Sequence, residues 1–210
     1  MARIGLFGGT FDPLHVGHLA VASAAGHALG LAEVHFVVAH RPWQKVGTRQ
    51  IAPSPLRLAM VEAATAHRDD FVASSVEIDR GGSSYTIDTV ETLLATDAEA
   101  GIANEYVLVV GSDVVGDLDT WHRHEELREL VGLAVIDRPG DIGVTPPEGW
   151  KFDRVDAPLV NLSSSMLRAR LAAGEPVDYL VPREALAVFE SWRDEGSAEP
   201  RPHPEQEATE

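Results

Sequence analysis

Residues 8–19, with the sequence GGTFDPLHVGHL, combine residue types and spacings that could bind and activate a phosphate. The segment lies between an apolar run and an Ala-rich helical pattern, so we expect it at the carboxyl edge of a sheet, where open α/β folds bind ligands. Gly8 and Gly9 predict a tight turn whose backbone can approach a phosphate closely. His15 and His18 share one face of the first helical turn, where unpaired amides and the helix dipole favour anions.

Other interpretations of this segment are weaker. A dinucleotide fingerprint requires G-x-G-x-x-G, which GLFGGTFDP does not supply. A zinc-binding histidine pair on a helix is usually spaced four apart with a third ligand nearby. An isolated pair such as His15 and His18 would more often cap and pack a helix, but its place in a Gly-Gly-Thr-Phe-Asp-Pro turn favours anion binding.

A second candidate anion site is the segment NLSSSMLRARL, residues 161–171. Ser163 or Ser164 can cap a helix whose first amides face outward, and Arg168 follows one turn later, within reach of a triphosphate. Taken alone, this pattern is more often an ordinary Ser-capped amphipathic helix. The presence of both segments in one chain favours a nucleotide site.

The elements that must position these segments alternate between short apolar runs and longer helical patterns, as in βαβ units. Strands are predicted at residues 3–7, 34–38, 71–78, 106–110 and 133–136. Helices are predicted at residues 16–29, 55–66, 85–95, 125–130, 164–172 and 183–193, and a long loop at residues 39–53. We therefore expect an α/β fold with a doubly wound, Rossmann-like parallel sheet, in a single domain over residues 1–193 that includes the C-terminal helices. Residues 194–210 read as a disordered acidic tail.

The composition excludes several classes of function. A formal net charge of −16, with Lys45 and Lys151 as the only lysines among 210 residues, argues against a protein that wraps nucleic acid. The absence of cysteine excludes disulfides and thiolate catalysis. Neither motif carries carboxylates at metal-ligand spacing, so no protein metal site is predicted. No apolar run approaches the roughly 20 residues that span a bilayer, and the N-terminus does not resemble a signal peptide, so we expect a cytoplasmic protein without membrane contact. The sequence is compatible with a homo-oligomer.

Two further segments carry residues that could bind a second substrate in addition to the nucleotide. SSYTIDT places Tyr85 and Thr86 at the start of a helix, and GSDVVGDLDTWHRHEEL places Trp121 and His122 directly after an expected N-cap at residue 119 or 120. A Trp face can stack on a flat ring, while helix amides and a Thr hydroxyl favour a carboxylate over a carboxamide. Taken singly, Trp121 is more often a half-buried core residue and Thr86 an ordinary helix-start residue. Together these features suit nicotinate.

The first segment resembles the GxFDPxHxGH signature of the nucleotidylyltransferase superfamily, which is related to the HIGH motif of class I aminoacyl-tRNA synthetases. LSSSMLR resembles the superfamily's ISSTxIR motif, with Leu162, Ser165 and Leu167 replacing residues of the same polar or apolar character. The resemblance implies that His15 and His18 are catalytic and hold the α- and β-phosphates of ATP, with His18 stabilising the developing charge. It also implies that Asp12 and Pro13 shape the turn.

Residues 1–193 resemble the bacterial nicotinate-mononucleotide adenylyltransferases, on SYTIDT and on GSD followed by a Trp eight residues later. The ATP-binding residues implied by both resemblances are Gly8, Gly9, Thr10, Phe11, His15, His18, Gly111, Asp113, Ser163, Ser164, Ser165 and Arg168. The implied nicotinate mononucleotide contacts are Trp43, Lys45, Tyr85, Thr86, Trp121 and His122, with Gln44 and Arg138 as further phosphate contacts.

The resemblance implies transfer of the adenylyl group of ATP to nicotinate mononucleotide, with Mg²⁺ carried on the ATP phosphates. The products are nicotinate adenine dinucleotide and pyrophosphate. Two alternatives stay open: a relative with another acceptor, such as a phosphopantetheine adenylyltransferase or a cytidylyltransferase, and a nucleotide-sensing module without chemistry. The Trp121 and Thr86 arrangement argues against the first, and the intact His15, His18 and Arg168 argue against the second.

Overall fold

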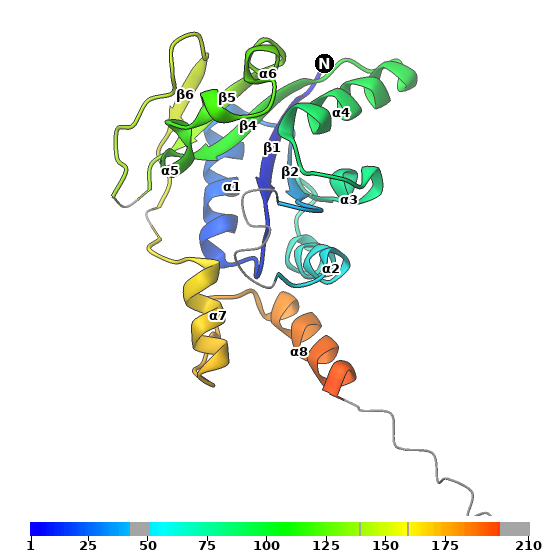
Figure 1. Ribbon diagram of the computed structural model, residues 1–210, viewed down its shortest axis with the longest axis vertical. Helices are drawn as coiled ribbons and strands as arrows, with labels where there is room; N and C mark the ends of the chain where they lie inside the picture. Colours follow the sequence, from blue (N-terminus) through cyan, green and yellow to red (C-terminus); the bar gives the residue numbers. More distant parts are fainter. Residues whose placement is uncertain (43–50, 139, 159, 198–210) are drawn as a thin grey trace, which may run out of the picture.

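The computed structural model describes residues 1–42, 51–138, 140–158 and 160–197. One sheet contains β1 (Arg3–Gly9), β2 (Glu33–Val38), β3 (Phe71–Ser74), β4 (Glu105–Gly111), β5 (Val131–Ile136) and β6 (Phe152–Val155). Its strand order is β3-β2-β1-β4-β5-β6, and every neighbouring pair is parallel. The direction of winding reverses between β1 and β4, which lie at the centre of the sheet (Figure 1). The predicted doubly wound fold is confirmed, and its ligand site is expected where β1 and β4 end.

Helices connect and cover these strands. They are α1 (Val16–Leu29), α2 (Ser54–Thr65), α3 (Val76–Arg80), α4 (Thr86–Ala100), α5 (Ser112–Val115), α6 (His124–Leu130), α7 (Ser164–Ala172) and α8 (Arg183–Ser197). A 3₁₀ turn, Leu118–Thr120, precedes α6. Among the described residues, none of these helices has the length and apolar character needed to cross a membrane.

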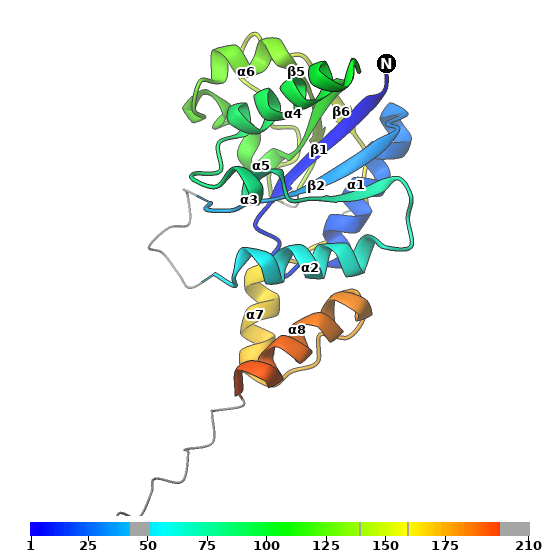
Figure 2. The same cartoon turned by 90° about the vertical axis from the view of Figure 1, so that its right-hand side faces the viewer.

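The sheet has an apolar core on each face. In β4, Val107 and Val109 face the core formed with α1 and α2, while Tyr106 and Leu108 face the core formed with α4 and α6. Successive residues of a strand point to opposite faces, so a strand buried on both faces is apolar along its buried length, as β4 is from Tyr106 to Val110. Figure 2 shows α4 and α6 on one side of the strands, with α1 and α2 on the other.

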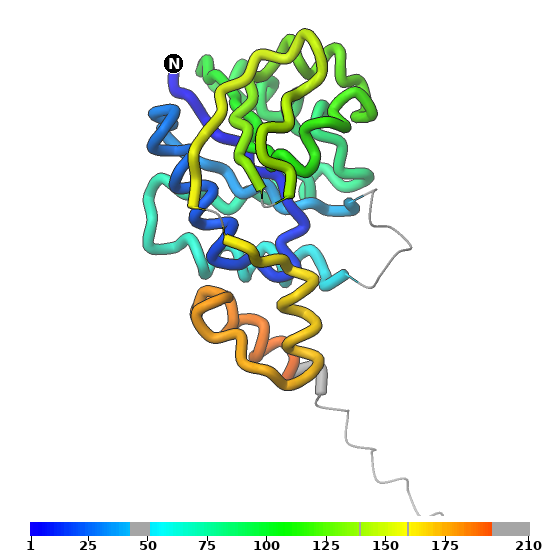
Figure 3. The backbone as a smooth tube through the Cα atoms, turned by 90° about the vertical axis from the view of Figure 1, so that its left-hand side faces the viewer, coloured from blue at the N-terminus to red at the C-terminus, as the bar shows by residue number. Residues whose placement is uncertain are grey.

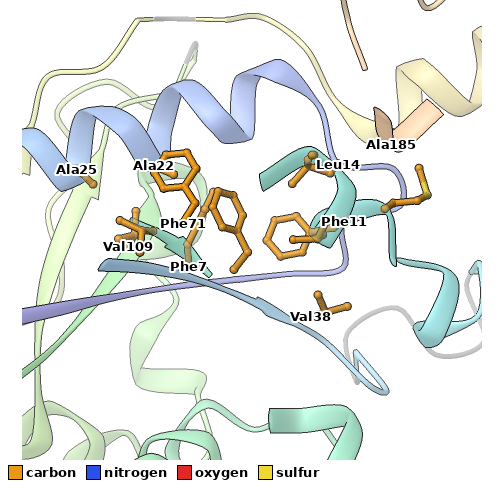
Figure 4. Close-up of a cluster of buried hydrophobic side chains, with 14 of the residues drawn as sticks. Phe7, Phe11, Leu14, Ala22, Ala25, Val38, Phe71, Val109 and Ala185 are labelled. Atoms are coloured by element: carbon orange, nitrogen blue, oxygen red, sulfur yellow. The ribbon is translucent and has the colours of Figure 1, made fainter. Parts of the chain in front are cut away.

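Small residues allow α1 to pack closely against the sheet. Ala22 and Ala25 are fully buried in the first core. Figure 4 shows the rings of Phe7, Phe11 and Phe71 lying between α1 and the strands below it. Gly30 ends the helix in the left-handed conformation, with φ 59° and ψ 41°, as its position at the end of the helical pattern indicates.

The last two helices form an appendage to this core. Figure 3 shows α7 and α8 together at one end of the molecule, beyond the sheet. α8 packs on α2, and Ala185 of α8 is buried in the first core. The predicted end of α8 at Arg193 is too early, since the helix continues to Ser197.

The predicted strand over residues 71–78 is correct only for its first half. β3 ends at Ser74, and residues 76–80 form α3. The amide of Asp79 donates to the Ser75 carbonyl at 2.9 Å, and the Ser75 hydroxyl donates to the Asp79 carboxylate at 2.6 Å, so the chain turns into a helix. A short run such as VEI fits a strand or a helix equally, and tertiary contacts decide between them.

Two short elements were not predicted. β6 is an edge strand whose first three residues are exposed, so its sequence FDRV shows no apolar run. α5 is a single helical turn after β4 and is too short for a periodic pattern. The conformation of both elements therefore depends more on packing against the rest of the fold than on a pattern in their own residues.

Candidate active site

The chain leaves β1 by a turn that differs from the predicted one. Gly8 and Gly9 belong to the strand, so the expected tight turn at these two glycines is wrong. The turn is made instead around Phe11, which has a φ of 48°. A Cβ on Gly9 would lie 2.7 Å from the Phe11 ring, whereas a Cβ on Gly8 would meet no described atom within 4 Å. Glycine at position 9 therefore makes room for Phe11, and Gly8 leaves the strand end uncovered.

The two histidines of the first motif lie against each other at the start of α1. His15 is the N-cap residue, and its amide donates to Nδ1 of His18 at 3.1 Å. Their rings stack with centroids 3.7 Å apart, and Phe11 meets the His18 ring edge-on at 5.2 Å. Because Nδ1 of His18 accepts a hydrogen bond, the proton of its neutral ring is on Nε2. The Nε2–H group of His18 can therefore donate a hydrogen bond to a phosphate oxygen.

His15 is buried, with 3% of its surface exposed. Burial and the positive charge of Arg138 lower its pKa to about 4, so its ring is neutral at pH 7. Its Nδ1 is also buried and has no hydrogen-bond partner among the described residues. His15 is therefore suited to a hydrogen bond with a bound ligand and is not expected to carry a positive charge at neutral pH.

The second motif begins α7 and contacts the first motif directly. Ser163 is the N-cap residue, and its hydroxyl accepts from the Met166 amide at 3.2 Å, which confirms one of the two predicted caps. The Ser164 hydroxyl donates to the carbonyl of Pro13 at 2.9 Å. Arg168 donates to the carbonyl of Asp12 at 2.6 Å, so the turn at Asp12 and Pro13 is tied to α7.

A cleft of about 440 Å³ lies at the ends of β1 and β4, between the two motifs. It is lined by every residue that the sequence assigned to ATP: Gly8, Gly9, Thr10, Phe11, His15, His18, Gly111, Asp113, Ser163, Ser164, Ser165 and Arg168. Two helix N-termini, those of α1 and α7, begin at this cleft. The positive ends of these two helix dipoles make the cleft suitable for a polyphosphate despite the negative net charge of the chain.

Arg138 lies on the opposite wall of the cleft, at the end of β5. Its Nε lies 3.2 Å from a carboxylate oxygen of Asp113, and its amide donates to the Ser112 hydroxyl at 2.7 Å. A Cβ on Gly111 would meet the Asp113 carboxylate and would lie 2.6 Å from the Arg138 Nε. Glycine at position 111 thus allows the ion pair to lie across the end of β4.

The predicted pyridine pocket is formed in part and corrected in part. Thr86 is the first residue of α4, as predicted, and both Thr86 and Trp121 line the cleft. However, the expected N-cap at residue 119 or 120 is wrong, because Trp121 is extended and α6 begins only at His124, after Arg123 with a φ of 53°. His122 is therefore exposed and outside the first turn of α6. The other two predicted contacts that the structure describes, Tyr85 and His122, do not line the cleft. Their rings contact each other, with the centroids 4.5 Å apart.

Comparisons with known proteins agree with this geometry. A family model described as cytidylyltransferase-like matches residues 6–170. A protein of Herpetosiphon aurantiacus, named "Probable nicotinate-nucleotide adenylyltransferase", is 38% identical over 197 residues, covering 90% of this chain and 96% of that protein. The chain belongs to the cytidylyltransferase-like family, among the nicotinate-nucleotide adenylyltransferases.

Other members of the family cover a similar span. A Saccharopolyspora erythraea protein with the same name is 41% identical over 182 residues, covering 86% of this chain and 83% of that protein. A solved structure of Plasmodium falciparum nicotinic acid mononucleotide adenylyltransferase complexed with NaAD has a TM-score of 0.73 at 16% identity. It covers 92% of this chain and 97% of the other, which shows that the two share a fold.

Sequence reasoning missed two buried charged residues beside the cleft. Arg57 of α2 has 1% of its surface exposed and donates to the carbonyls of Thr10, at 2.6 Å, and of Ala39, at 2.7 Å. Its signal in the sequence is its place four residues before Val61, on the apolar face of α2. Glu77 of α3 lines the cleft and accepts from the Thr89 hydroxyl at 2.8 Å. No signal marked Glu77, because its helix was read as a strand.

Three predicted contacts cannot be placed. Trp43, Gln44 and Lys45 lie outside the described residues. The residue before them, Pro42, lines the cleft. The neighbouring Arg41 exchanges two hydrogen bonds with Ser84, each of 3.2 Å, which places this end of the segment beside the start of α4.

Proposed function

We propose that this chain transfers the adenylyl group of ATP to nicotinate mononucleotide, giving nicotinate adenine dinucleotide and pyrophosphate. The observation that carries the proposal is the contact between the two motifs: Arg168 of α7 on the carbonyl of Asp12, within one cleft at the switch point of the sheet. The names of the relatives support the same reaction.

In this proposal ATP lies across the ends of β1 and β4. Its phosphates lie at the N-termini of α1 and α7, within reach of His15, His18 and Arg168, with the three serines of the second motif beside them. The adenosine lies near Gly111 and Asp113, whose carboxylate can accept from a ribose hydroxyl. The open backbone at Gly8 lets the phosphates approach the strand end.

A phosphate oxygen of nicotinate mononucleotide attacks the α-phosphorus of ATP. The new oxygen–phosphorus bond forms in line with the bond to the β-phosphate, which breaks and releases pyrophosphate. The attacking phosphate is already ionised at neutral pH, so the protein needs no strong general base. Its proposed contribution is to align the two phosphates and to stabilise the developing charge through the Nε2 proton of His18 and the guanidinium of Arg168.

The nicotinate ring would stack on Trp121, with its carboxylate at the N-terminus of α4. The hydroxyl of Thr86 and the first amides of α4 favour a carboxylate there. The start of α4 thus takes the role that the sequence analysis assigned to a helix capped at residue 119 or 120, and the His122 amide and the Tyr85 ring are proposed as neighbouring contacts. Lys45 and Trp43 are proposed contacts of the mononucleotide phosphate.

ATP is proposed to enter as its magnesium complex. Within the part of the chain that the structure describes, no group of three or more His, Asp or Glu side chains is placed to hold a metal ion. The phosphates of ATP would therefore supply the ligands of the ion, as part of the substrate. A cytoplasmic location and a homo-oligomeric state stay predictions from the sequence.

The test is pyrophosphate release from magnesium-ATP with one acceptor in each reaction: nicotinate mononucleotide, nicotinamide mononucleotide or phosphopantetheine. We expect strong preference for nicotinate mononucleotide. Release with phosphopantetheine alone would keep adenylyl transfer and overturn the pyridine pocket. ATP binding without release from any acceptor would favour a nucleotide-binding module instead.

A further inference from the structure

Arg123 links α4, whose first residue Thr86 lines the cleft, to α6, which follows the cleft residue Trp121. Its guanidinium donates to both carboxylate oxygens of Glu91 in α4, at 2.9 and 2.7 Å. It also donates to both carboxylate oxygens of Glu126 in α6, at 2.8 and 2.6 Å. A planar guanidinium can make two such paired contacts at once, whereas a lysine ammonium cannot. The link thus depends on arginine and not on positive charge alone.

The backbone of Arg123 is also unusual. Its φ of 53° and ψ of 41° lie in the left-handed region, which is unfavourable for a residue with a Cβ. This conformation joins the extended backbone of Trp121, with φ −74° and ψ 145°, to the first turn of α6. A strained residue persists where surrounding contacts fix it, and here the contacts are the ion pairs with Glu91 and Glu126.

The two sides joined by Arg123 carry the two pyridine-contacting residues. Trp121 lies two residues before Arg123, and Thr86 begins the helix that contains Glu91. α4 and α6 are in contact, and Figure 2 shows them side by side. The ring contact between Tyr85 and His122 at 4.5 Å is a second link between the same two segments. These contacts join the segment that carries Trp121 to the helix that begins at Thr86.

We propose that Arg123 is a positioning residue that fixes the spacing between Trp121 and Thr86 and thereby the fit of the acceptor's flat ring. The inference rests on the proposed function and goes beyond it, because Arg123 touches no substrate. The ATP end of the cleft is formed by β1, α1 and α7 together with Gly111 and Asp113 at the end of β4, whereas the hydrogen bonds of Arg123 go to Glu91 and Glu126 in α4 and α6. Loss of Arg123 should therefore weaken acceptor binding and leave ATP binding intact.

Steady-state kinetics with each substrate varied in turn test this split. For Arg123→Ala we expect KM for nicotinate mononucleotide to rise about tenfold, with KM for ATP changed by less than about twofold. Arg123→Lys should recover only part of the loss, because it keeps the charge without the paired contacts. Glu91→Gln should raise the same KM, and Arg123→Ala combined with Glu91→Gln should be no worse than Arg123→Ala alone.

Arg68→Ala is the matched control, because Arg68 is an exposed arginine that makes the same kind of paired contact, to Asp70, away from the cleft. If Arg123→Ala does not fold, Arg123→Gly replaces it, since glycine adopts the left-handed conformation without strain. Equal rises in both KM values, or no rise in the acceptor KM, would overturn the positioning role. Failure of the wild-type protein to use nicotinate mononucleotide would instead overturn the proposed function.

Discussion

Arg168 donates from Nη1 to the carbonyl oxygen of Asp12 at 2.6 Å, although 156 residues separate them in the chain. The same guanidinium donates from Nη2 to the Ser165 hydroxyl at 2.9 Å. One side chain therefore holds the turn after β1 against the start of α7. The two motifs act as one site because this contact fixes their relative position.

Arg168→Lys should lower kcat/KM by about 10- to 100-fold, with a rise in KM for ATP. Lysine keeps the charge but cannot bond the Asp12 carbonyl and the Ser165 hydroxyl as a fork. Steady-state kinetics with ATP varied measure the effect. Arg170→Lys, in the same helix but bonded to the Pro176 carbonyl, is the control and should behave as wild type. Similar activity of the two variants would contradict the role of Arg168.

His18→Ala should lower kcat by about 100-fold and change the affinity for ATP by less than about threefold. The Nε2 proton of His18 is assigned to charge that develops only in the transition state, so its loss affects turnover more than binding. Single-turnover rates and ATP titration measure the two quantities separately. His27→Asn, at the exposed end of the same helix, is the control. Equal losses in binding and turnover would remove the transition-state role.

His15 should make the stability of the free protein fall in acid. Its folded pKa of about 4 lies below the unfolded value of 6.5, so the unfolded chain binds a proton that the folded chain does not. The contribution of neutral His15 to the free energy of unfolding is complete above about pH 6.5 and is lost as the pH falls toward 4. The loss amounts to about 2 kcal/mol between pH 7 and pH 5. Urea unfolding of the wild type and of His15→Gln at both pH values isolates this contribution. An identical pH dependence for both proteins would contradict it.

Gly9 and Gly8 should respond differently to alanine. Gly9→Ala places a Cβ 2.7 Å from the buried Phe11 ring and should lower the free energy of unfolding by about 1–3 kcal/mol. Gly8→Ala meets no described atom within 4 Å and should leave stability within about 0.5 kcal/mol. Because the Gly8 backbone is the proposed approach for the phosphates, its alanine variant should instead raise KM for ATP. Urea unfolding and kinetics of both variants check the contrast, which a shared loss of stability would rule out.

Features that depend only on neighbouring residues along the chain could be predicted without the structure. The apolar runs, the Gly30 helix end and the Ser163 cap follow from local backbone preferences and from period-2 and period-3.6 patterns. These patterns were sufficient for the parallel fold, and the residue types and family resemblance of the two motifs were sufficient to predict that they lie at one site. They were insufficient for β6, α3 and α5, which are too short or too polar to show a period of their own.

Tertiary structure alone decided the contacts between residues far apart in the chain. The burial of Arg57 beneath the Thr10 carbonyl, the bond from Arg168 to Asp12 and the two ion pairs of Arg123 all join separate elements. α6 begins only at His124, after the left-handed backbone of Arg123, although the residue pattern predicted a cap at residue 119 or 120. A local pattern cannot encode such contacts, because their energy depends on the spatial arrangement of the elements and on the water that burial excludes.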